Sequence, residues 1–291
     1  MEQQVGRVLG VLGGFYTVKT EQGTVECRGR GTLRRQGQSP VAGDLVRVSV
    51  QEDMTGALEE LLPRKNALRR PPVANVDCLV LVVSVTDPAP NLPVLDAMIA
   101  LAEEQEIEPI IVLNKIDLED GAALHELYRK AGFSTFSVSA ATGEGMEQLL
   151  PALAGKLCVF SGNSGVGKSS LLNRLDPRLG LSTGETSRKL GRGRHTTRAT
   201  VLYEREDGGF FADTPGFSSL ELPRLTDVQT ENLPFCFREF LPYLGKCKFT
   251  SCRHVSEKGC AVCAAVEAGE IAPSRHQSYC AMLKELDVDR Y

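Results

Sequence analysis

Eight residues in the second half of the chain, Gly162 to Ser169 (GNSGVGKS), constrain the fold more than any other segment. They match the phosphate-loop pattern, which needs an apolar strand before the loop and a helix after it. The sequence supplies both, as KLCVFSG (156–162) and SSLLNRL (169–175). The pattern predicts that backbone N–H groups curl around phosphates, with Lys168 reaching the β/γ oxygens and Ser169 ligating Mg²⁺. A simple glycine turn before a helix is the alternative interpretation.

Apolar strands alternate with helical stretches on both sides of this loop. We expect strands at 78–85, 109–117, 134–140, 156–162, 200–204 and 209–212, and helices around 92–105, 122–131 and 144–154. Strands and helices that alternate at this spacing predict βαβ units and a largely parallel α/β sheet.

The regions before and after this pattern differ from it. Residues 1–62 consist of short β-rich segments with turn signals, which predicts a small β-barrel. The basic, proline-bearing stretch 64–72 has the character of a linker or interdomain strap. The last 65 or so residues are mainly helical in pattern and contain a cysteine-rich loop. We therefore expect a multidomain chain with domains at 1–70, 71–222 and 223–291.

Composition excludes several classes of protein. The chain has 291 residues, of which 42% are hydrophobic and 24% charged, so it is neither disordered nor fibrous. Its apolar runs are too short to cross a bilayer, and no export signal precedes them, so we expect a cytoplasmic protein with no membrane partner. Nine cysteines, an odd number, indicate reduced thiols, with metal ligation where they cluster.

A second motif points to guanine. Asn114-Lys115-Ile116-Asp117 follows the apolar strand PIIVL, and Ser139-Ala140 follows another strand. A carboxylate at Asp117 can accept from N1–H and N2–H₂ of guanine, whereas adenine offers no such donor pair. We expect Asn114 at the opposite edge of the base, Lys115 packed along it, and a backbone N–H near Ser139-Ala140 on the guanine oxygen. A strand-end turn is the alternative. The predicted nucleotide set is Asn114, Lys115, Asp117, Ser139, Ala140, Gly162, Asn163, Ser164, Gly165, Val166, Gly167, Lys168, Ser169 and Ser170.

The catalytic candidates lie downstream of the phosphate loop. In DTPG (213–216), Asp213 can hold a water on Mg²⁺ and Gly216 can offer its N–H to the γ-phosphate, although DTPG is also a good turn. Thr196 or Thr197 could reach Mg²⁺ and the γ-phosphate from a mobile switch loop. Phe217 follows the switch glycine where many GTPases carry a water-orienting glutamine, so we expect slow intrinsic turnover. His195 is a candidate to position water, or a solvated loop histidine.

The order of the motifs is itself unusual. The base-recognition elements come before the phosphate loop, and GTPases usually have the reverse order. The same sheet can form if the usual termini are joined near 151–156 and the chain opens after the γ-phosphate switch. That switch then runs directly into the C-terminal domain, so a change of nucleotide state can pull on that domain.

Four metal-ligand residues fall within 14 positions near the C-terminus, as Cys247-x4-Cys252-x-His254-x5-Cys260. This set suits a closed tetrahedral zinc site, with Cys260/Cys263 as an alternative pair. A zinc ion would stabilise a segment too small to do so by apolar burial. Cys27, Cys78, Cys158 and Cys236 are interpreted as buried small hydrophobes.

Arginines concentrate in two segments. They are Arg28, Arg30, Arg34 and Arg35 near the N-terminus, and Arg188, Arg192, Arg194 and Arg198 with Lys189 in the switch loop. Each arginine alone suits a solvated surface. Together, with Phe15 and Tyr16 available to stack on bases, they favour RNA through local basic patches, since the net charge is −4.

The motifs together resemble one family. They are RGRG, PVAGD, RPPVANVD, NKID, GNSGVGKSSLLN, LGRGRHTTR, DTPGFSSLEL and CxxxxCxH…GCAV, and they resemble the ribosome small-subunit-dependent GTPase A (RsgA/YjeQ) family over essentially the whole chain. The resemblance implies an N-terminal OB-fold, a circularly permuted GTPase domain and a C-terminal zinc domain. It also implies GTP hydrolysis to GDP and phosphate, stimulated by the small (30S) ribosomal subunit and its rRNA during late assembly. We expect a monomer.

Two functional hypotheses remain open at this point. In the first, the protein is a GTPase whose turnover is switched on by ribosomal RNA. In the second, it is an RNA-binding checkpoint in which GTP stabilises a bound conformation and hydrolysis is incidental. Phe217 keeps the second open, and His195 together with the Mg²⁺ and phosphate set favours the first.

Overall fold

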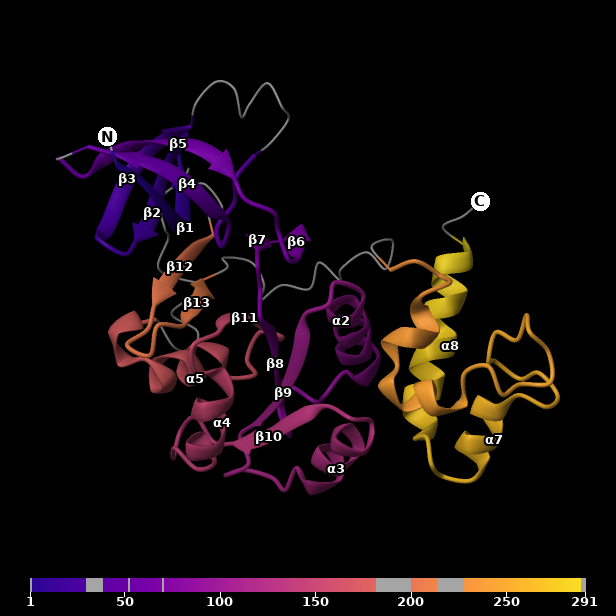
Figure 1. Ribbon diagram of the computed structural model, residues 1–291. Helices are drawn as coiled ribbons and strands as arrows, with labels where there is room; N and C mark the ends of the chain where they lie inside the picture. The colour runs from indigo at the N-terminus through magenta and orange to yellow at the C-terminus, as the bar shows by residue number, and fades with distance from the viewer. Residues whose placement is uncertain are drawn as a thin grey trace. The chain divides into compact units, whose positions relative to one another are not determined.

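The computed structural model describes residues 2–29, 39–51, 53–69, 71–181, 200–213 and 228–288, and Figure 1 shows its elements. The chain forms two compact units. The first unit comprises Met1–Leu79, Leu149–Ser161 and Lys168–Ser218, and the second comprises Val80–Gln148, Gly162–Gly167 and Ser219–Tyr291. The domain boundaries expected near 70 and 222 stay predictions.

The first unit begins with a barrel (Figure 1). Its strands are β1 (Glu2–Leu12), β2 (Phe15–Thr20), β3 (Gly23–Gly29), β4 (Leu45–Val50) and β5 (Thr55–Leu61). They follow the order β1-β2-β3-β5-β4, and β4 pairs back onto β1, so the sheet closes. Alternate residues point inward, as the period of a strand requires, and the interior holds Val8, Val18, Val25, Val46, Val48 and Leu58. The predicted small barrel is confirmed.

The segment after the barrel is ordered by buried polar side chains. Where the sequence predicts a linker or interdomain strap, at 64–72, β6 (Ala67–Arg69) and β7 (Pro72–Ala74) form an antiparallel ribbon. Arg64 donates to both carboxylate oxygens of the buried Asp44, at 2.7 and 2.8 Å. Asn66 accepts from the Val76 backbone N–H and donates to its carbonyl. The Asn66 bonds satisfy backbone groups that a solvated linker would leave to water.

The rest of the first unit carries the strand that leads to the phosphate loop. β11 (Leu157–Ser161) runs parallel to β13 (Phe210–Asp213), and β12 (Val201–Glu204) pairs antiparallel with β13 and meets β1. Helix α5 (Lys168–Leu175) and the short 3₁₀ turn η1 (Pro177–Leu179) belong to this unit. Helix α4 (Met146–Leu153) starts in the second unit and ends in the first.

The second unit contains the β-α-β pattern that the sequence predicts. β8 (Cys78–Ser84), which starts in the first unit, is followed by α2 (Leu92–Glu104), β9 (Glu108–Asn114), α3 (Ala122–Lys130) and β10 (Ser134–Val138). The strand order is β10-β9-β8, and β9 and β10 are parallel. β8 and β9 are buried along nearly their whole length, which explains their continuous apolar sequences.

The C-terminal part of the second unit is mainly helical. It contains η3 (Leu233–Cys236), η4 (Arg238–Tyr243), α7 (Ala261–Glu267) and α8 (Pro273–Val288), shown in orange and yellow in Figure 1. The rings of Phe237, Phe240 and Tyr279 pack against one another in tilted and edge-to-face arrangements, with centroid distances of 5.0 to 5.3 Å, and Ala97 and Ala100 of α2 join the same core. Across the described ranges, every helix falls short of the length and apolarity needed to span a membrane.

Candidate nucleotide and metal sites

The phosphate-loop segment joins β11 to α5, as the pattern predicts. Two of its glycines are needed because other atoms lie where a Cβ would be. A Cβ on Gly162 would lie 2.4 Å from the Val82 carbonyl oxygen. A Cβ on Gly167, which has φ +90°, would lie 2.3 Å from the Asn114 side-chain nitrogen. Any side chain at either position would push the loop away from the strands that support it.

Asn114 joins the three segments that the sequence proposes for the nucleotide. It ends β9 with only 2% of its surface exposed. Its Nδ2 donates to the Val166 carbonyl of the phosphate loop at 2.8 Å, and its Oδ1 accepts from the Ala140 N–H at 3.0 Å. The NKID motif, the phosphate loop and Ser139-Ala140 are therefore adjacent, although 25 to 50 residues separate them in the sequence.

Ser139 and Ala140 lie in a tight turn after β10. The Ser139 N–H donates to the Glu144 carbonyl at 3.0 Å, and its hydroxyl accepts from the Thr142 N–H at 3.1 Å. The Ala140 N–H is bonded to Asn114. For Ala140 to bind a guanine oxygen as predicted, this N–H would have to exchange Asn114 for the base or share itself between them.

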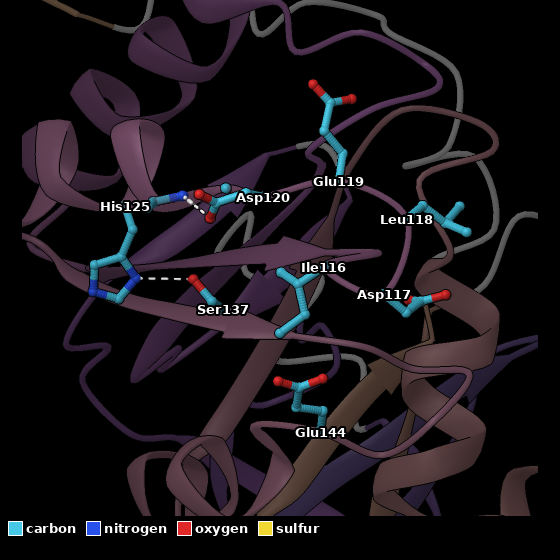
Figure 2. Close-up of a pocket in the computed structure, with 10 residues that line it drawn as sticks. Ile116, Asp117, Leu118, Glu119, Asp120, His125, Ser137 and Glu144 are labelled. Atoms are coloured by element: carbon cyan, nitrogen blue, oxygen red, sulfur yellow. Dashed lines mark hydrogen bonds between the residues drawn. The ribbon is translucent and has the colours of Figure 1, made fainter.

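Lys115 and Asp117 occupy the turn after β9. Lys115 has a left-handed backbone (φ +72°), and its ammonium donates to the carbonyl oxygen of Asp87. Asp117 is exposed and borders an open cavity of about 580 Å³, lined also by His125, Ser137 and Glu144. Figure 2 shows the Asp117 carboxylate pointing away from the hydrogen-bonded His125–Ser137 pair. An exposed carboxylate in this position is accessible to a ligand.

The remaining nucleotide candidates follow the loop. Lys168, Ser169 and Ser170 form the first turn of α5, where backbone N–H groups lack helical partners and attract anions. Asp213 ends β13, which is parallel to β11. His195, Thr196, Thr197 and Gly216 lie outside the residues that the structure describes.

Near the C-terminus, Cys247, Cys252, His254 and Cys260 bring their ligand atoms within 4.8 Å of one another. His254 Nδ1 lies 3.5 Å from the Sγ atoms of both Cys247 and Cys260, and those two sulfurs are 3.9 Å apart. A tetrahedron with Zn–S of about 2.3 Å and Zn–N of about 2.0 Å has edges of roughly 3.5 to 3.8 Å. The four ligand atoms therefore fit a zinc ion.

Backbone donors around this cluster suit thiolates. The Ala261 N–H points at Cys247 Sγ at 3.3 Å, and the Cys263 N–H points at Cys260 Sγ at 3.4 Å. The cluster in the described part of the chain thus contains Cys260, while Cys263 contributes its backbone N–H. Burial raises the pKa of Cys252 to about 12 and that of Cys260 to about 11, so metal binding must release protons. Burial also lowers the pKa of His254, which favours the neutral imidazole that a metal needs.

One carboxylate organises the loop between the ligands. Glu257 accepts hydrogen bonds from the backbone N–H groups of Arg253, Val255 and Ser256, at 2.8 to 3.1 Å. His254, between the first two of these residues, has a left-handed backbone (φ +61°). Glu257 therefore stabilises the turn that points the histidine ring at the sulfurs.

Comparison with known proteins agrees with this geometry. A family model described as RsgA GTPase matches residues 61–223, and a model described as RsgA N-terminal domain matches residues 5–58. The small ribosomal subunit biogenesis GTPase RsgA of Caldanaerobacter subterraneus subsp. tengcongensis is 45% identical over 289 residues, which cover 98% of this chain and 97% of the relative. The protein of the same name from Moorella thermoacetica is also 45% identical, over 97% of each chain.

The chain belongs to the RsgA GTPase family. It is accordingly a GTP hydrolase. The crystal structure of YjeQ from Thermotoga maritima matches with a TM-score of 0.83 and 37% identity, over 98% of this chain and 99% of that one. YloQ, described as a circularly permuted GTPase, matches with a TM-score of 0.82 and 36% identity, over 100% of this chain and 96% of that one. The resemblance, the order of motifs and the fold class predicted from the sequence are confirmed.

Several residues that support the nucleotide and metal sites of this RsgA-family GTPase lie outside the sequence motifs. Ser84, at the end of β8, donates to the Asp87 carbonyl, and Lys115 donates to the same carbonyl. The DPAPN turn after an apolar strand was the available signal, because it lies at the same strand-end position as NKID. Arg275 is buried and belongs to no motif, and its partners Asp96 and Glu239 are distant in the sequence, so no local pattern indicates its role. Glu257 also belongs to no motif, although the N–H groups that it binds lie within four residues of it.

Proposed function

We propose that this protein acts in the biogenesis of the small ribosomal subunit, binding the subunit and hydrolysing GTP to GDP and phosphate with turnover stimulated by it. The observation that carries this proposal is the similarity to proteins named for that role, which extends over 98% of the chain and nearly the full length of the relatives. A match of this length spans the barrel, the GTPase segment and the region of the cysteine cluster.

In this proposal, nucleotide recognition divides between two sets of residues. Asp117 accepts from guanine, Lys115 lies along the base, and Asn114 holds the base motif against the phosphate loop. Backbone N–H groups of the loop and Lys168 bind the phosphates, and Ser169 ligates Mg²⁺, which neutralises charge on the β and γ oxygens. The hydrogen bonds of Asn114 support this arrangement, since they already bring the segments together.

Hydrolysis in this proposal involves the segment before and after β13. Asp213 orders a water on Mg²⁺, Gly216 donates its N–H to the γ-phosphate, and Thr196 or Thr197 completes the switch. His195 positions the attacking water once a partner orders its loop. Because Phe217 cannot orient water, turnover without the partner is slow. The sequence pattern supports these roles.

The cysteine cluster holds one structural zinc ion in this proposal. Its four ligand atoms are all protein-derived and close to tetrahedral spacing, so no position remains for substrate. The zinc would fix the loop 247–260, which presents basic side chains. Lys248 and Lys258 in this loop and Lys246 just before it are exposed, and Lys248 lies over the exposed ring of Phe249 at 5.4 Å.

A second basic and aromatic surface lies on the barrel. Arg28 stacks over the ring of Phe15 at 4.8 Å, and Phe15 is 37% exposed. Cations beside accessible aromatic rings suit an RNA backbone and its bases. We infer that both surfaces contact rRNA, that residues 1–70, 71–222 and 223–291 act as RNA-binding, GTPase and zinc domains, and that the protein works as a monomer in the cytoplasm, where ribosomes assemble.

The test measures GTP turnover by the purified protein with and without small ribosomal subunits, with ATP as the nucleotide control. Stimulation with GTP and none with ATP is expected. His195→Ala should lower stimulated turnover and preserve GTP affinity. Lys248→Glu should weaken subunit binding, whereas Lys130→Glu, on the exposed face of α3, should not. GTP binding with no stimulation at saturating subunit would refute the stimulated enzyme and support the checkpoint hypothesis.

A further inference from the structure

The loop between β8 and α2, residues Val85 to Asn91, contacts both nucleotide-binding motifs although it belongs to neither. The Lys115 ammonium donates to the carbonyl oxygen of Asp87. Pro88 lies next to the phosphate loop, because a Cβ added to Gly165 would be 3.5 Å from Pro88 Cδ. All of these residues belong to the second unit. The loop is therefore placed to influence how the base motif and the phosphate loop are arranged.

Ser84, the last residue of β8, fixes the shape of this loop. Its side chain is completely buried, and its hydroxyl donates to the Asp87 carbonyl at 3.1 Å and accepts from the Thr86 N–H at 3.2 Å. The next N–H, that of Val85, donates to the Asn114 carbonyl at 3.0 Å. The start of the loop is thus bonded to the end of β9, one residue before Lys115.

The Asp87 carbonyl consequently accepts two hydrogen bonds, one from the Ser84 hydroxyl and one from Lys115. A carbonyl oxygen has two lone pairs, so both bonds can form together. The Ser84 bond keeps this carbonyl facing Lys115. Because this carbonyl is neutral, the Lys115 ammonium keeps its positive charge and can still attract an anionic nucleotide.

We propose that Ser84 is a positioning residue for guanine-nucleotide binding and that it acts through Lys115. A lysine side chain has four rotatable bonds, and ordering it on binding lowers affinity. Anchoring the ammonium to Asp87 before the nucleotide arrives removes part of that cost. Ser84 touches no nucleotide itself, and its effect on affinity depends on the presence of the Lys115 ammonium.

The experiment is a double-mutant cycle on nucleotide affinity. We would measure the equilibrium binding and dissociation rate of fluorescent GDP for wild type, Ser84→Ala, Lys115→Met and the double variant, all as full-length chains. Ser84→Ala should weaken GDP binding by about 3- to 10-fold, the effect expected for one lost hydrogen bond. In the Lys115→Met background the same change should alter affinity by less than about twofold.

The matched control is Ser49→Ala in the barrel. Ser49 is also a buried serine, and its hydroxyl donates to Glu59 at 2.7 Å, but it lies in the first unit outside the nucleotide motifs. Ser49→Ala should leave GDP affinity unchanged. The thermal unfolding of the nucleotide-free variants shows whether either serine is needed for the fold itself.

Three results would overturn the proposal. They are unchanged GDP affinity in Ser84→Ala, an equal loss in the presence and absence of Lys115, or an equal loss in Ser49→Ala. If Ser84→Ala fails to fold, Ser84→Cys replaces it, since a thiol of similar size is only a weak donor. The loss of GDP affinity caused by Ser84→Cys must also disappear when Lys115→Met is present in the same chain. No ribosomal subunit is used, so failure here leaves the proposed subunit-dependent function untouched.

Discussion

Arg275 offers a direct test of what holds the C-terminal helices against α2. Its guanidinium is 1% exposed and donates to Asp96 of α2 at 2.6 Å and to Glu239 of η4 at 2.7 Å. Tyr128 of α3 donates its hydroxyl to the same Asp96 oxygen at 2.9 Å. The ring of Phe237 lies 4.5 Å from the guanidinium carbon. One cation thus joins helices from distant parts of the chain.

The charges in this cluster depend on one another. Burial lowers the pKa of Arg275, but Asp96 and Glu239 raise it more, so the net shift is upward and the cation persists. Burial, followed by the Asp96 carboxylate, raises the pKa of Tyr128, which therefore stays protonated and able to donate. Replacing Arg275 by Met leaves two carboxylates in the interior without a counter-ion. Breaking a buried pair in this way costs about 3 to 5 kcal/mol.

The assay is urea unfolding of Arg275→Met and wild type, followed by circular dichroism because the chain has no tryptophan. Since two units need not unfold together, hydrogen exchange in α8 gives the local free energy of opening. The control is Arg129→Met, which removes an exposed pair with Glu126 on α3 and should cost less than about 1 kcal/mol. We expect α8 to lose protection in Arg275→Met and to keep it in the control.

An apolar replacement separates charge from packing. If unpaired charge is the cause, Arg275→Met combined with Asp96→Leu, Glu239→Met and Tyr128→Phe should recover most of the lost stability. A loss in Arg275→Met no larger than that in Arg129→Met would refute the reasoning. Failure of the apolar combination to recover any stability would show that the shape of the arginine, rather than its charge, holds the helices together.

Three further predictions concern the two sites. Asn114→Ala removes hydrogen bonds to two loops, which should weaken GTP binding by roughly 30-fold, or about 2 kcal/mol, in a titration; an affinity within twofold of wild type would contradict the bridging role. Chelation should release one zinc per chain and expose amides of 247–260 to hydrogen exchange while α8 stays protected by its aromatic core; simultaneous loss of both would contradict this. For Glu257, burial raises the pKa, but backbone N–H donors lower it more, to about 2. Its stabilising effect is therefore complete above the unfolded pKa of about 4.3 and disappears as the pH falls toward 2, so the difference in opening of 247–260 between wild type and Glu257→Gln should vanish over that range.

Much of the fold could be predicted because its signals are local. The alternation of apolar strands and helical segments gave β8 to β11 and α2 to α4 within a few residues of their observed ends. Cys27, Cys78, Cys158 and Cys236 are buried, as expected for free cysteines that behave as small hydrophobes. Composition left open whether 64–72 is a linker or an interdomain strap. Its order comes from Asp44, from Asn66 bonded to Val76 and from Asn75 bonded to Gly43, and no local composition reveals these partners.

The sequence by itself determined the chemistry of this protein. Glycine spacing before Lys168, the carboxylate of Asp117 and four metal-ligand residues within 14 positions define what can be bound, because these properties belong to residue types at short range. The tertiary structure decided which distant groups meet. Asn114 reaches Val166 and Ala140, Ser84 reaches Lys115 through Asp87, and Arg275 reaches Asp96 across 179 positions. These contacts depend on how helices and strands pack, and packing satisfies buried polar groups with whatever partners the fold brings near.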